Sequence, residues 1–234
     1  MKIKALVQAR MGSKRCPGKC MATIQGKPSI EIVLNRLKKA KQISEIILIT
    51  SNLKRDLILK NFAKKNNYKF FCGSENDLIK RFLGAQQKYC KNDKYFLRVT
   101  SDNIFIDWKE VDKIINFGLR HKVDFCSHVN SFIAKRNNDF SGEFIKIDAL
   151  KKVDKLTHSP FDREHVYPFF FNNKQMFKVK RLEVSNSLKS SIKFDLDYKK
   201  DLKFFQSIGK KIDKNLFHYP THKIIKFSEG IKNV

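Results

Sequence analysis

Short apolar runs alternate with amphipathic segments over the first 129 residues, and this pattern constrains the fold more than composition does. The apolar runs predict strands at 2–8, 45–51, 69–73, 95–102 and 123–129. Apolar residues at helical spacing between them predict helices at 30–37, 54–67, 78–83 and 108–121. Strands that alternate with helices in this way form parallel sheets. The sequence therefore predicts a Rossmann-like α/β fold, with one mixed, mostly parallel sheet flanked by helices.

The chain after residue 130 is less regular. Residues 130–144 are polar and predict a loop. The elements expected beyond that loop are a short helix at 162–173, strands at 176–184 and 191–197, and a helix at 198–212. No repeat or low-complexity linker separates these elements from the first half. We therefore expect one domain over residues 1–234.

The charge of the chain favours anionic partners. Of 234 residues, 49 are Lys or Arg and 23 are Asp or Glu, so the formal net charge is +26. Such a charge suits nucleic acid, an anionic membrane or small anionic substrates. The excess is mainly lysine spread over the predicted helices, whereas nucleic-acid surfaces combine arginine with stacking aromatic residues. This distribution argues against nucleic acid as the main partner.

Segment lengths and cysteine usage restrict the class further. The longest apolar runs fall well short of the roughly 20 residues that span a bilayer, and the first ten residues do not read as a signal peptide. The five cysteines are odd in number and lack zinc-site spacing. We expect a cytoplasmic protein with reduced thiols and no membrane partner.

A strongly basic loop, "QARMGSKRCPGK", follows the first predicted strand. Its cations are Arg10, Lys14, Arg15 and Lys19. The small residues that let backbone N–H groups approach an anion are Gly12, Ser13 and Gly18. Open α/β sheets bind ligands at the carboxyl ends of their strands, which is where this loop begins. Its composition fits an anion-binding loop and an ordinary solvated loop equally well.

This loop is not a nucleotide-binding P-loop. Five residues rather than four separate Gly12 from Gly18, and Cys20 stands where a P-loop has Ser or Thr. The next predicted helix begins only near Pro28, whereas a P-loop leads directly into the helix whose N-terminus holds phosphate.

The loop resembles the signature of CMP-Kdo synthetases and spore-coat polysaccharide cytidylyltransferases, in the sugar nucleotidyltransferase superfamily. The matching fixed positions are Ala9, Arg10, Ser13, Arg15, Pro17, Gly18 and Lys19. Further segments are similar to that family in the same order, at 73–85, 98–107, 163–173 and 197–202. The resemblance covers nearly the whole chain.

The resemblance implies a GT-A-like, nucleotide-diphospho-sugar transferase fold. It implies transfer of CMP from CTP to an acidic sugar, Kdo-like or nonulosonate-like, for surface glycan biosynthesis, with release of pyrophosphate. It also implies a homodimer, with residues 1–129 binding the nucleotide and residues 130–234 binding the acceptor and forming the dimer. Two alternatives stay open: transfer from another NTP or to a sugar phosphate, and a degenerate scaffold that binds polyanions or nucleic acid.

Site residues follow from the same resemblance. The catalytic residues implied are Arg10, Arg15, Lys19 and Asp102. The nucleotide-binding residues also include Ala9, Gly12, Ser13, Thr50, Ser51, Asn52, Arg81 and Thr100. Arg163, Glu164 and His165 are the implied acceptor-binding residues, although a helix turn with a surface histidine would have the same sequence.

Two carboxylates are implied as ligands of Mg²⁺ or Mn²⁺. Asp102 and Asp197 each end a predicted strand, so both are expected at one edge of the sheet. Asp195 competes with Asp197, because residues two apart on a strand share a face. The chain departs from the family pattern at "SDNIF" (101–105), where Ser101 replaces a glycine beside Asp102.

Overall fold

The protein is described by a computed structural model over residues 1–128, 140–212 and 215–232. Its sheet has seven strands in the order β5-β4-β1-β6-β8-β7-β9. The strands are β1 (Ile3–Gln8), β4 (Ile43–Ser51), β5 (Lys69–Gly73), β6 (Tyr95–Thr100), β7 (Phe125–His128), β8 (Glu143–Lys146) and β9 (Val179–Leu182). The first four pair in parallel, β8 runs antiparallel to both β6 and β7, and β9 is parallel to β7. The predicted mixed, mostly parallel sheet is confirmed.

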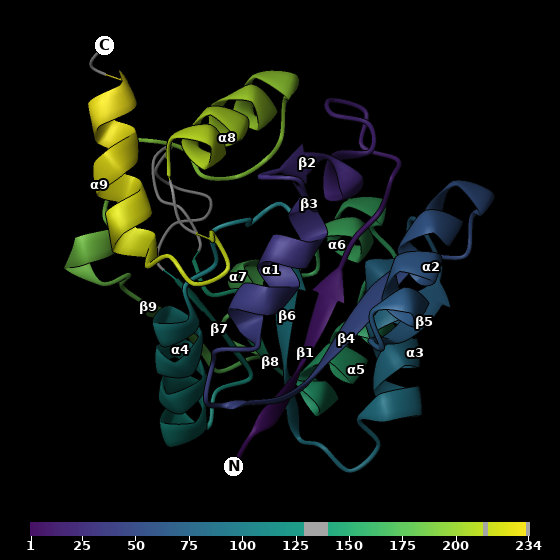
Figure 1. Ribbon diagram of the computed structural model, residues 1–234. Coiled ribbons are helices and arrows are strands. Elements are labelled where there is room, and N and C mark those ends of the chain that lie inside the picture. Colours follow the sequence, from purple (N-terminus) through teal and green to yellow (C-terminus); the bar gives the residue numbers. More distant parts are fainter. Residues whose placement is uncertain (129–139, 213–214, 233–234) are drawn as a thin grey trace.

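Helices cover both faces of this sheet (Figure 1). One face packs against α1 (Ser29–Leu37), α2 (Leu57–Lys65) and α4 (Trp108–His121). The other packs against α3 (Leu78–Tyr89), α5 (Ile147–Leu156) and α7 (Tyr167–Asn172). Alternate residues of β1 point to opposite faces, so Val7 joins the first core and Leu6 the second.

A third apolar cluster lies beside the sheet and holds the C-terminal part of the chain. It includes the hairpin of β2 (Thr23–Ile24) and β3 (Lys27–Pro28), together with α8 (Lys199–Lys211) and α9 (Thr221–Lys232). Stacked and edge-on contacts among phenylalanines from distant segments form its centre. The cluster brings the residues near 197 back to the carboxyl edge of the sheet.

The structure corrects several predicted elements. The strand predicted at 191–197 is absent from the sheet, and only an isolated bridge joins Asp195 to Asn103. Its alternation arises because Phe194 and Leu196 are buried in the third cluster while the residues between them are less buried. The pattern also missed β8, α5 and α9. Part of β8 fell within the predicted loop at 130–144. Residues 130–139 of that loop lie outside the described residues.

The predicted helix at 162–173 is two helices. α6 (Pro160–His165) and α7 meet at Val166, which is fully buried and has φ 67°. A β-branched residue rarely adopts positive φ, so surrounding packing must hold this turn in place.

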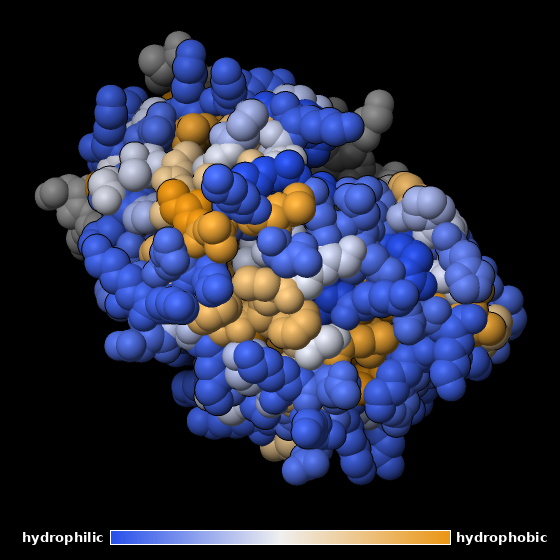
Figure 2. Space-filling model, turned by 90° about the vertical axis from the view of Figure 1, so that its right-hand side faces the viewer, coloured by the Kyte–Doolittle hydropathy of each residue, from blue (hydrophilic) through white to orange (hydrophobic). Residues whose placement is uncertain are grey.

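The surface agrees with the lysine distribution. The face in Figure 2 is mostly hydrophilic, and hydrophilic side chains interrupt its apolar areas. Among the described residues, no helix combines the length and apolar character needed to cross a membrane.

One buried carboxylate gives the fold a predictable pH dependence. Glu110 of α4 contacts the His128 ring of β7 at 3.0 Å and accepts a hydrogen bond from Ser185, after β9. Burial raises the pKa of Glu110, but its His128 and Ser185 contacts outweigh burial, so the net pKa lies below the ordinary 4.5. A carboxyl whose pKa falls on folding stabilises the protein above its unfolded pKa. That contribution is lost as the pH falls through the folded pKa.

We therefore expect Glu110→Gln to lower the melting temperature at neutral pH. The difference from the wild type should narrow as the pH falls below 4.5. Melting curves over that pH range would measure it, with Glu183→Gln as the control because the Glu183 side chain is 75% exposed. A constant difference at every pH would contradict a contribution from the ionised carboxylate.

Candidate active site

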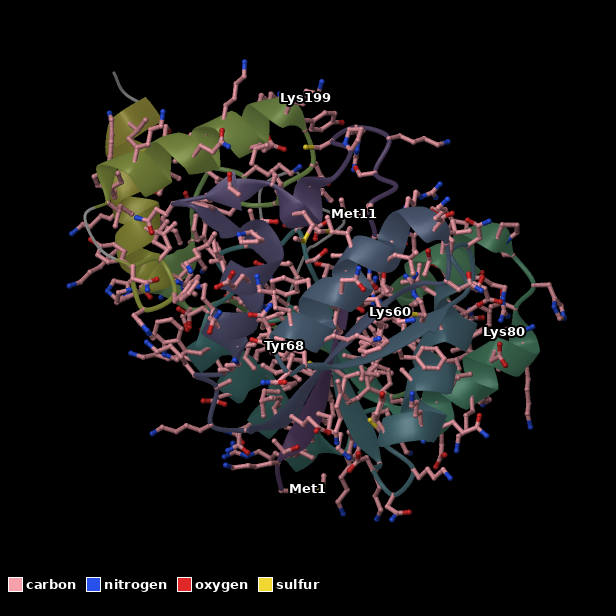
Figure 3. The ribbon with its side chains drawn as sticks, turned by 45° about the vertical axis from the view of Figure 1, so that its right-hand side comes forward. Met1, Met11, Lys60, Tyr68, Lys80 and Lys199 are labelled. Carbon is pink, nitrogen blue, oxygen red and sulfur yellow. The ribbon has the colours of Figure 1, made fainter. Side chains whose placement is uncertain are left out.

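The basic loop is held in place at both of its ends. β1 ends at Gln8, so the loop leaves the carboxyl edge of the sheet, and Figure 3 shows Met11 in the upper part of the molecule with Met1 at the bottom. The Met11 amide donates to buried Asp56 at 2.7 Å, and the Gly18 amide donates to the Met11 carbonyl at 3.1 Å. Gly18 has φ 72°, a left-handed conformation that glycine adopts without strain. Beyond it, Ser29 donates to the Lys19 carbonyl at 2.6 Å.

Lys19 lies between the two predicted metal ligands. Its Nζ is 2.9 Å from Asp102 Oδ2 and 3.4 Å from Asp197 Oδ1, and it donates to the Leu196 carbonyl at 2.7 Å. Only 13% of the Lys19 side chain is exposed. The structure thus brings together residues 19, 102 and 197, which are far apart in the sequence. Asp195 pairs through its backbone with Asn103 instead.

The ion cluster is arranged to stay charged. Burial alone would lower the pKa of Lys19, but Asp102 and Asp197 outweigh burial and the net pKa is raised. Burial would raise the pKa of Asp197, but Lys193, Lys19 and Arg15 outweigh it and the net pKa is lowered. At neutral pH Lys19 is therefore protonated and Asp197 is ionised, with Lys19, Lys193 and Arg15 around the Asp197 carboxylate.

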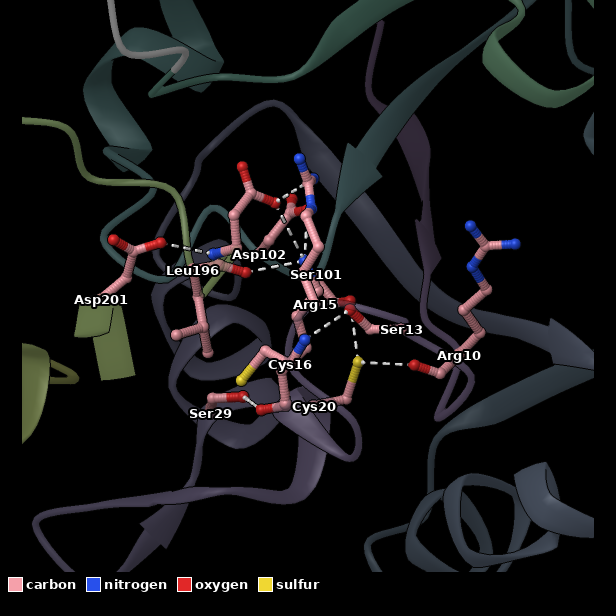
Figure 4. Close-up of polar contacts among 12 residues, drawn as sticks. Arg10, Ser13, Arg15, Cys16, Cys20, Ser29, Ser101, Asp102, Leu196 and Asp201 are labelled. Atoms are coloured by element: carbon pink, nitrogen blue, oxygen red, sulfur yellow. Dashed lines mark hydrogen bonds and ion pairs between the residues drawn. The ribbon is translucent and has the colours of Figure 1, made fainter. Parts of the chain in front are cut away.

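The two arginines of the loop point in different directions. Arg15 contacts Asp197 at 3.1 Å, and its guanidinium lies 4.9 Å from the ring centre of Tyr198. Arg10 instead pairs with Glu164 Oε1 at 2.9 Å, and its guanidinium points away from the Asp102 side of the loop in Figure 4. Both side chains remain partly exposed. Arg10 and Arg15 therefore present accessible cations on different sides of the loop.

The residues predicted to contact the base differ in exposure. Ser51 is buried and donates to Asp56, whereas Asn52 is exposed. Thr50 Oγ1 and the Nε and Nη1 atoms of Arg81 are buried without a hydrogen-bond partner among the described residues. Buried polar groups in native proteins are nearly always paired, so these atoms are suited to receive a ligand. Burial and the nearby Arg10 lower the pKa of Arg81 to about 10.

Two other predicted nucleotide-binding residues lie at strand ends. Ala9 is buried, and its amide donates to the Ile49 carbonyl at 3.0 Å. Thr100 ends β6 opposite Gln8 and is half-buried. Ser13 accepts from the Cys16 amide at 3.2 Å, so its hydroxyl stabilises the loop itself.

Arg163 has a structural environment that the sequence did not indicate. Its guanidinium contacts Asp77 at 2.7 Å and Asp154 at 2.5 Å, and it donates to the Thr157 carbonyl at 2.8 Å. These contacts fasten α6 to α3 and α5. The acceptor role predicted for Arg163 gains no support from this geometry, because all three guanidinium nitrogens already bind the protein.

Glu164 and His165 remain next to the loop. Glu164 pairs with Arg10, as described above. Burial lowers the pKa of His165, and the positive charges of Arg98 and Arg10 lower it further, although Glu164 acts in the opposite direction. The His165 ring is therefore close to the cationic side of the site.

The sequence pattern missed several residues that build this edge. Arg98 donates to Gln8 at 2.9 Å and pairs with Glu143 at 2.5 Å. These contacts join the ends of β1, β6 and β8. Arg55 lies so close to Gly12 that a Cβ there would come within 3.0 Å of its guanidinium. Arg98 belongs to the 98–107 segment that resembles the family, and this resemblance was the one sequence signal that could have identified it. No sequence signal pointed to Glu143 or Arg55.

The departure at Ser101 is accommodated inside the protein. Its hydroxyl lies 3.2 Å from the Cys20 sulfur, and that thiol donates to the Arg10 carbonyl at 3.4 Å (Figure 4). Burial raises the pKa of the Cys20 thiol, so it stays protonated and able to donate. The added hydroxyl is thus paired under the loop.

A separate hollow of about 450 Å³ lies between the β2–β3 hairpin and the end of α8. Gln25, Lys27 and Lys210 are among its lining residues. None of the predicted site residues lines it, so the candidate site remains the open edge around the basic loop.

The chain is similar in sequence to proteins of one family. A family described as cytidylyltransferase matches residues 4–224. MJ1063 of Methanocaldococcus jannaschii, an uncharacterized protein, is 32% identical over 238 residues, covering 100% of this chain and 94% of that protein. The spore coat polysaccharide biosynthesis protein SpsF of Bacillus subtilis is 23% identical over 212 residues (88% and 85% covered). The 3-deoxy-manno-octulosonate cytidylyltransferase of Thermodesulfovibrio yellowstonii is 26% identical over 183 residues (74% and 71%).

Solved structures agree with the sequence matches. A cytidylyltransferase from Leptospira borgpetersenii superposes with a TM-score of 0.89 at 27% identity, covering 100% of this chain and 96% of that one. A CMP:2-keto-3-deoxy-manno-octonic acid synthetase in complex with CTP gives 0.66 at 16% identity, covering 90% and 99%, which supports the fold alone. Because the family match spans nearly the whole described fold, the chain belongs to the cytidylyltransferase family and is a CTP-using nucleotidyltransferase.

Proposed function

We propose that the enzyme transfers CMP from CTP to a hydroxyl of an acidic sugar, with release of pyrophosphate. The observation that carries this proposal is the cluster of Lys19, Asp102 and Asp197 beside the partly exposed Arg10 and Arg15. Relatives named for 3-deoxy-manno-octulosonate and for its 8-amino-3,8-dideoxy form support the acceptor class.

The donor set suits a divalent cation. Asp102 and Asp197 already share one cationic group, and Mg²⁺ commonly takes one or two protein carboxylates together with phosphate oxygens and water. We propose that these two carboxylates hold Mg²⁺ or Mn²⁺. Such an ion would neutralise charge on the reacting phosphate.

The side chains of the loop supply the remaining charge. We propose that Arg10, Arg15 and Lys19 bind the phosphates of CTP and stabilise the leaving pyrophosphate. Arginine suits bidentate contact, whereas lysine acts as a point charge. Arg81 and Thr50 hold buried atoms that find no hydrogen-bond partner in the described part of the chain and that would contact the nucleotide. Phosphoryl transfer depends mainly on such positioning, so no dedicated general base is required.

The acceptor would approach from the side of α6. Glu164 and His165 lie there beside Arg10, and Arg98 adds positive charge below them. We retain the proposal that residues 130–234 supply acceptor and dimer contacts. Part of the region predicted for dimerisation, including 130–139, lies outside the described residues. A place in cytoplasmic surface glycan synthesis follows from the family resemblance.

Thermal unfolding tests the nucleotide half of the proposal. Ligands that bind only the folded state raise the melting temperature. We expect CTP with Mg²⁺ to raise it more than UTP, GTP or ATP at equal concentration, and Mg²⁺ removal by EDTA to reduce the shift. Equal shifts for all nucleotides and for inorganic polyphosphate would instead favour a general polyanion surface.

Pyrophosphate release tests the acceptor half. The assay would contain CTP, Mg²⁺ and either 3-deoxy-manno-octulosonate or its 8-amino analogue, with glucose 1-phosphate as the alternative acceptor. Release that requires a sugar acid supports the proposal. Release only with the sugar phosphate, or only with another NTP, would replace it with the alternative transferase.

A further inference from the structure

We infer that Phe161 forms a stacking surface for the acceptor sugar, an inference that rests on the proposed function. Phe161 is 54% exposed at the first turn of α6. Isolated exposed apolar side chains are common on protein surfaces, so exposure alone would carry nothing. Phe161 differs from such isolated side chains because its helix is anchored to α3 and α5 and because it lies beside the cationic loop.

The helix that carries Phe161 is firmly anchored on another face. Arg163 fastens it to α3 through Asp77 and to α5 through Asp154. Ser159 caps its first turn, and the buried turn at Val166 ends it. The Phe161 ring is therefore presented at a defined position, so little conformational entropy would be lost when a ligand packs against it.

The exposed ring is continuous with the acceptor side of the site. Phe161 and His165 lie one helical turn apart, and their ring centres are 4.7 Å apart. His165 in turn lies near the positive charges of Arg10 and Arg98. Glu164, between the two rings in sequence, pairs with Arg10 at 2.9 Å. An apolar ring thus adjoins a set of polar and charged groups.

This combination matches the chemistry of a sugar acid. Ligand sites combine aromatic surface with a few placed polar groups. A sugar ring presents one face of C–H bonds, and the electron-rich face of an aromatic ring attracts such groups. The charged groups of the loop would meet the carboxylate and hydroxyls, while Phe161 would cover the C–H face.

Tyr198, on the other side of the site, provides a contrast. It is 42% exposed, but Arg15, Lys193 and Lys200 all lie within 6 Å of its ring centre. Phe161 has no such cation among the described residues, and its ring contact there is with His165. Its open face is therefore the one suited to a neutral C–H surface.

Steady-state kinetics with 3-deoxy-manno-octulosonate and CTP would test the inference. We expect Phe161→Ala to raise the acceptor KM roughly two- to twelvefold, which is the range of aromatic stacking energies converted to affinity. kcat and the CTP KM should change by less than about twofold, because the ring contact of Phe161 is with His165 and a stacking role would act on acceptor binding. Phe161→Trp should restore the acceptor KM, and Phe161→Leu should restore it only in part.

Leu156→Ala is the matched control. Leu156 is 45% exposed at the end of the neighbouring helix α5. If a second copy of the chain covered this surface, both Phe161→Ala and Leu156→Ala would weaken self-association in light scattering. That result, or an unchanged acceptor KM in Phe161→Ala, would overturn the stacking role.

The same experiment separates the two proposals. A wild-type enzyme that turns over the sugar acid, with Phe161→Ala equally active, leaves the proposed function standing and overturns this inference alone. A wild-type enzyme that binds CTP but neither binds nor turns over either sugar acid overturns the proposed acceptor class. The stacking role then falls with it.

Discussion

Asp102→Asn is expected to reduce kcat roughly a thousandfold while the protein stays folded. Asn has the same shape as Asp. Its side-chain oxygen can still accept the hydrogen bond that Lys19 Nζ donates to Asp102 Oδ2 at 2.9 Å in the wild type. It removes the negative charge that, with Asp197, would hold a divalent cation against the phosphate. The physical reason is therefore lost charge at the reacting centre rather than lost packing.

Single-turnover pyrophosphate release, together with the melting temperature, would measure the effect. Asp93→Asn is the matched control, because Asp93 makes a similar ion pair with Lys4 at 2.7 Å at the start of β1. That variant should keep near wild-type turnover. Full activity in Asp102→Asn would remove Asp102 from the proposed metal site. Equal loss in both variants would indicate a general effect on folding.

Arg36→Met is expected to destabilise the fold by about 3–5 kcal/mol, because it leaves buried acceptors unpaired. Arg36 is fully buried in α1. Its guanidinium donates to the Ile106, Leu216 and Tyr219 carbonyls and to the Thr221 hydroxyl, at 2.6–2.8 Å. These contacts tie α1 to the segment after β6 and to the segment that leads into α9. Burial lowers the pKa of Arg36 to about 10, so it remains charged at neutral pH.

Thermal and denaturant unfolding would measure this loss, which corresponds to a fall of roughly 10 °C in the melting temperature for a chain of this size. Arg120→Met, at an exposed position of α4, is the control, and it should change the melting temperature little. A similar small change in Arg36→Met would mean that the carbonyls find other partners, including water. Proteolysis of the C-terminal region would show whether α9 is released first.

The local pattern of apolar residues was sufficient to predict strands and helices wherever their burial is periodic along the chain. The strand before the basic loop and the helices on both faces follow from apolar residues at spacings of two and of three to four. The same logic failed at 191–197, since alternating burial against the third cluster imitates a strand without its ladder of hydrogen bonds. It also failed at Val166, because a buried β-branched residue is not expected at positive φ.

The residues of the candidate site divide in the same way. Arg10, Arg15 and Lys19 were identifiable because they are adjacent in a loop that resembles a family signature. Their directions were not: Arg15 turns to Asp197 and Arg10 to Glu164. Arg163, which shares its segment with Glu164, proved to be an internal anchor.

By itself the sequence determined the α/β class, the basic loop at the end of the first strand and the family, because periodicity and contiguous motifs depend on neighbours along the chain. Only the tertiary structure decided which charges meet. The contact of Lys19 with Asp102 and Asp197, and the burial of Arg36 against the segment before α9, join residues from different parts of the chain. Such contacts depend on how the third apolar cluster packs against the sheet, and this packing leaves no periodic pattern in the sequence.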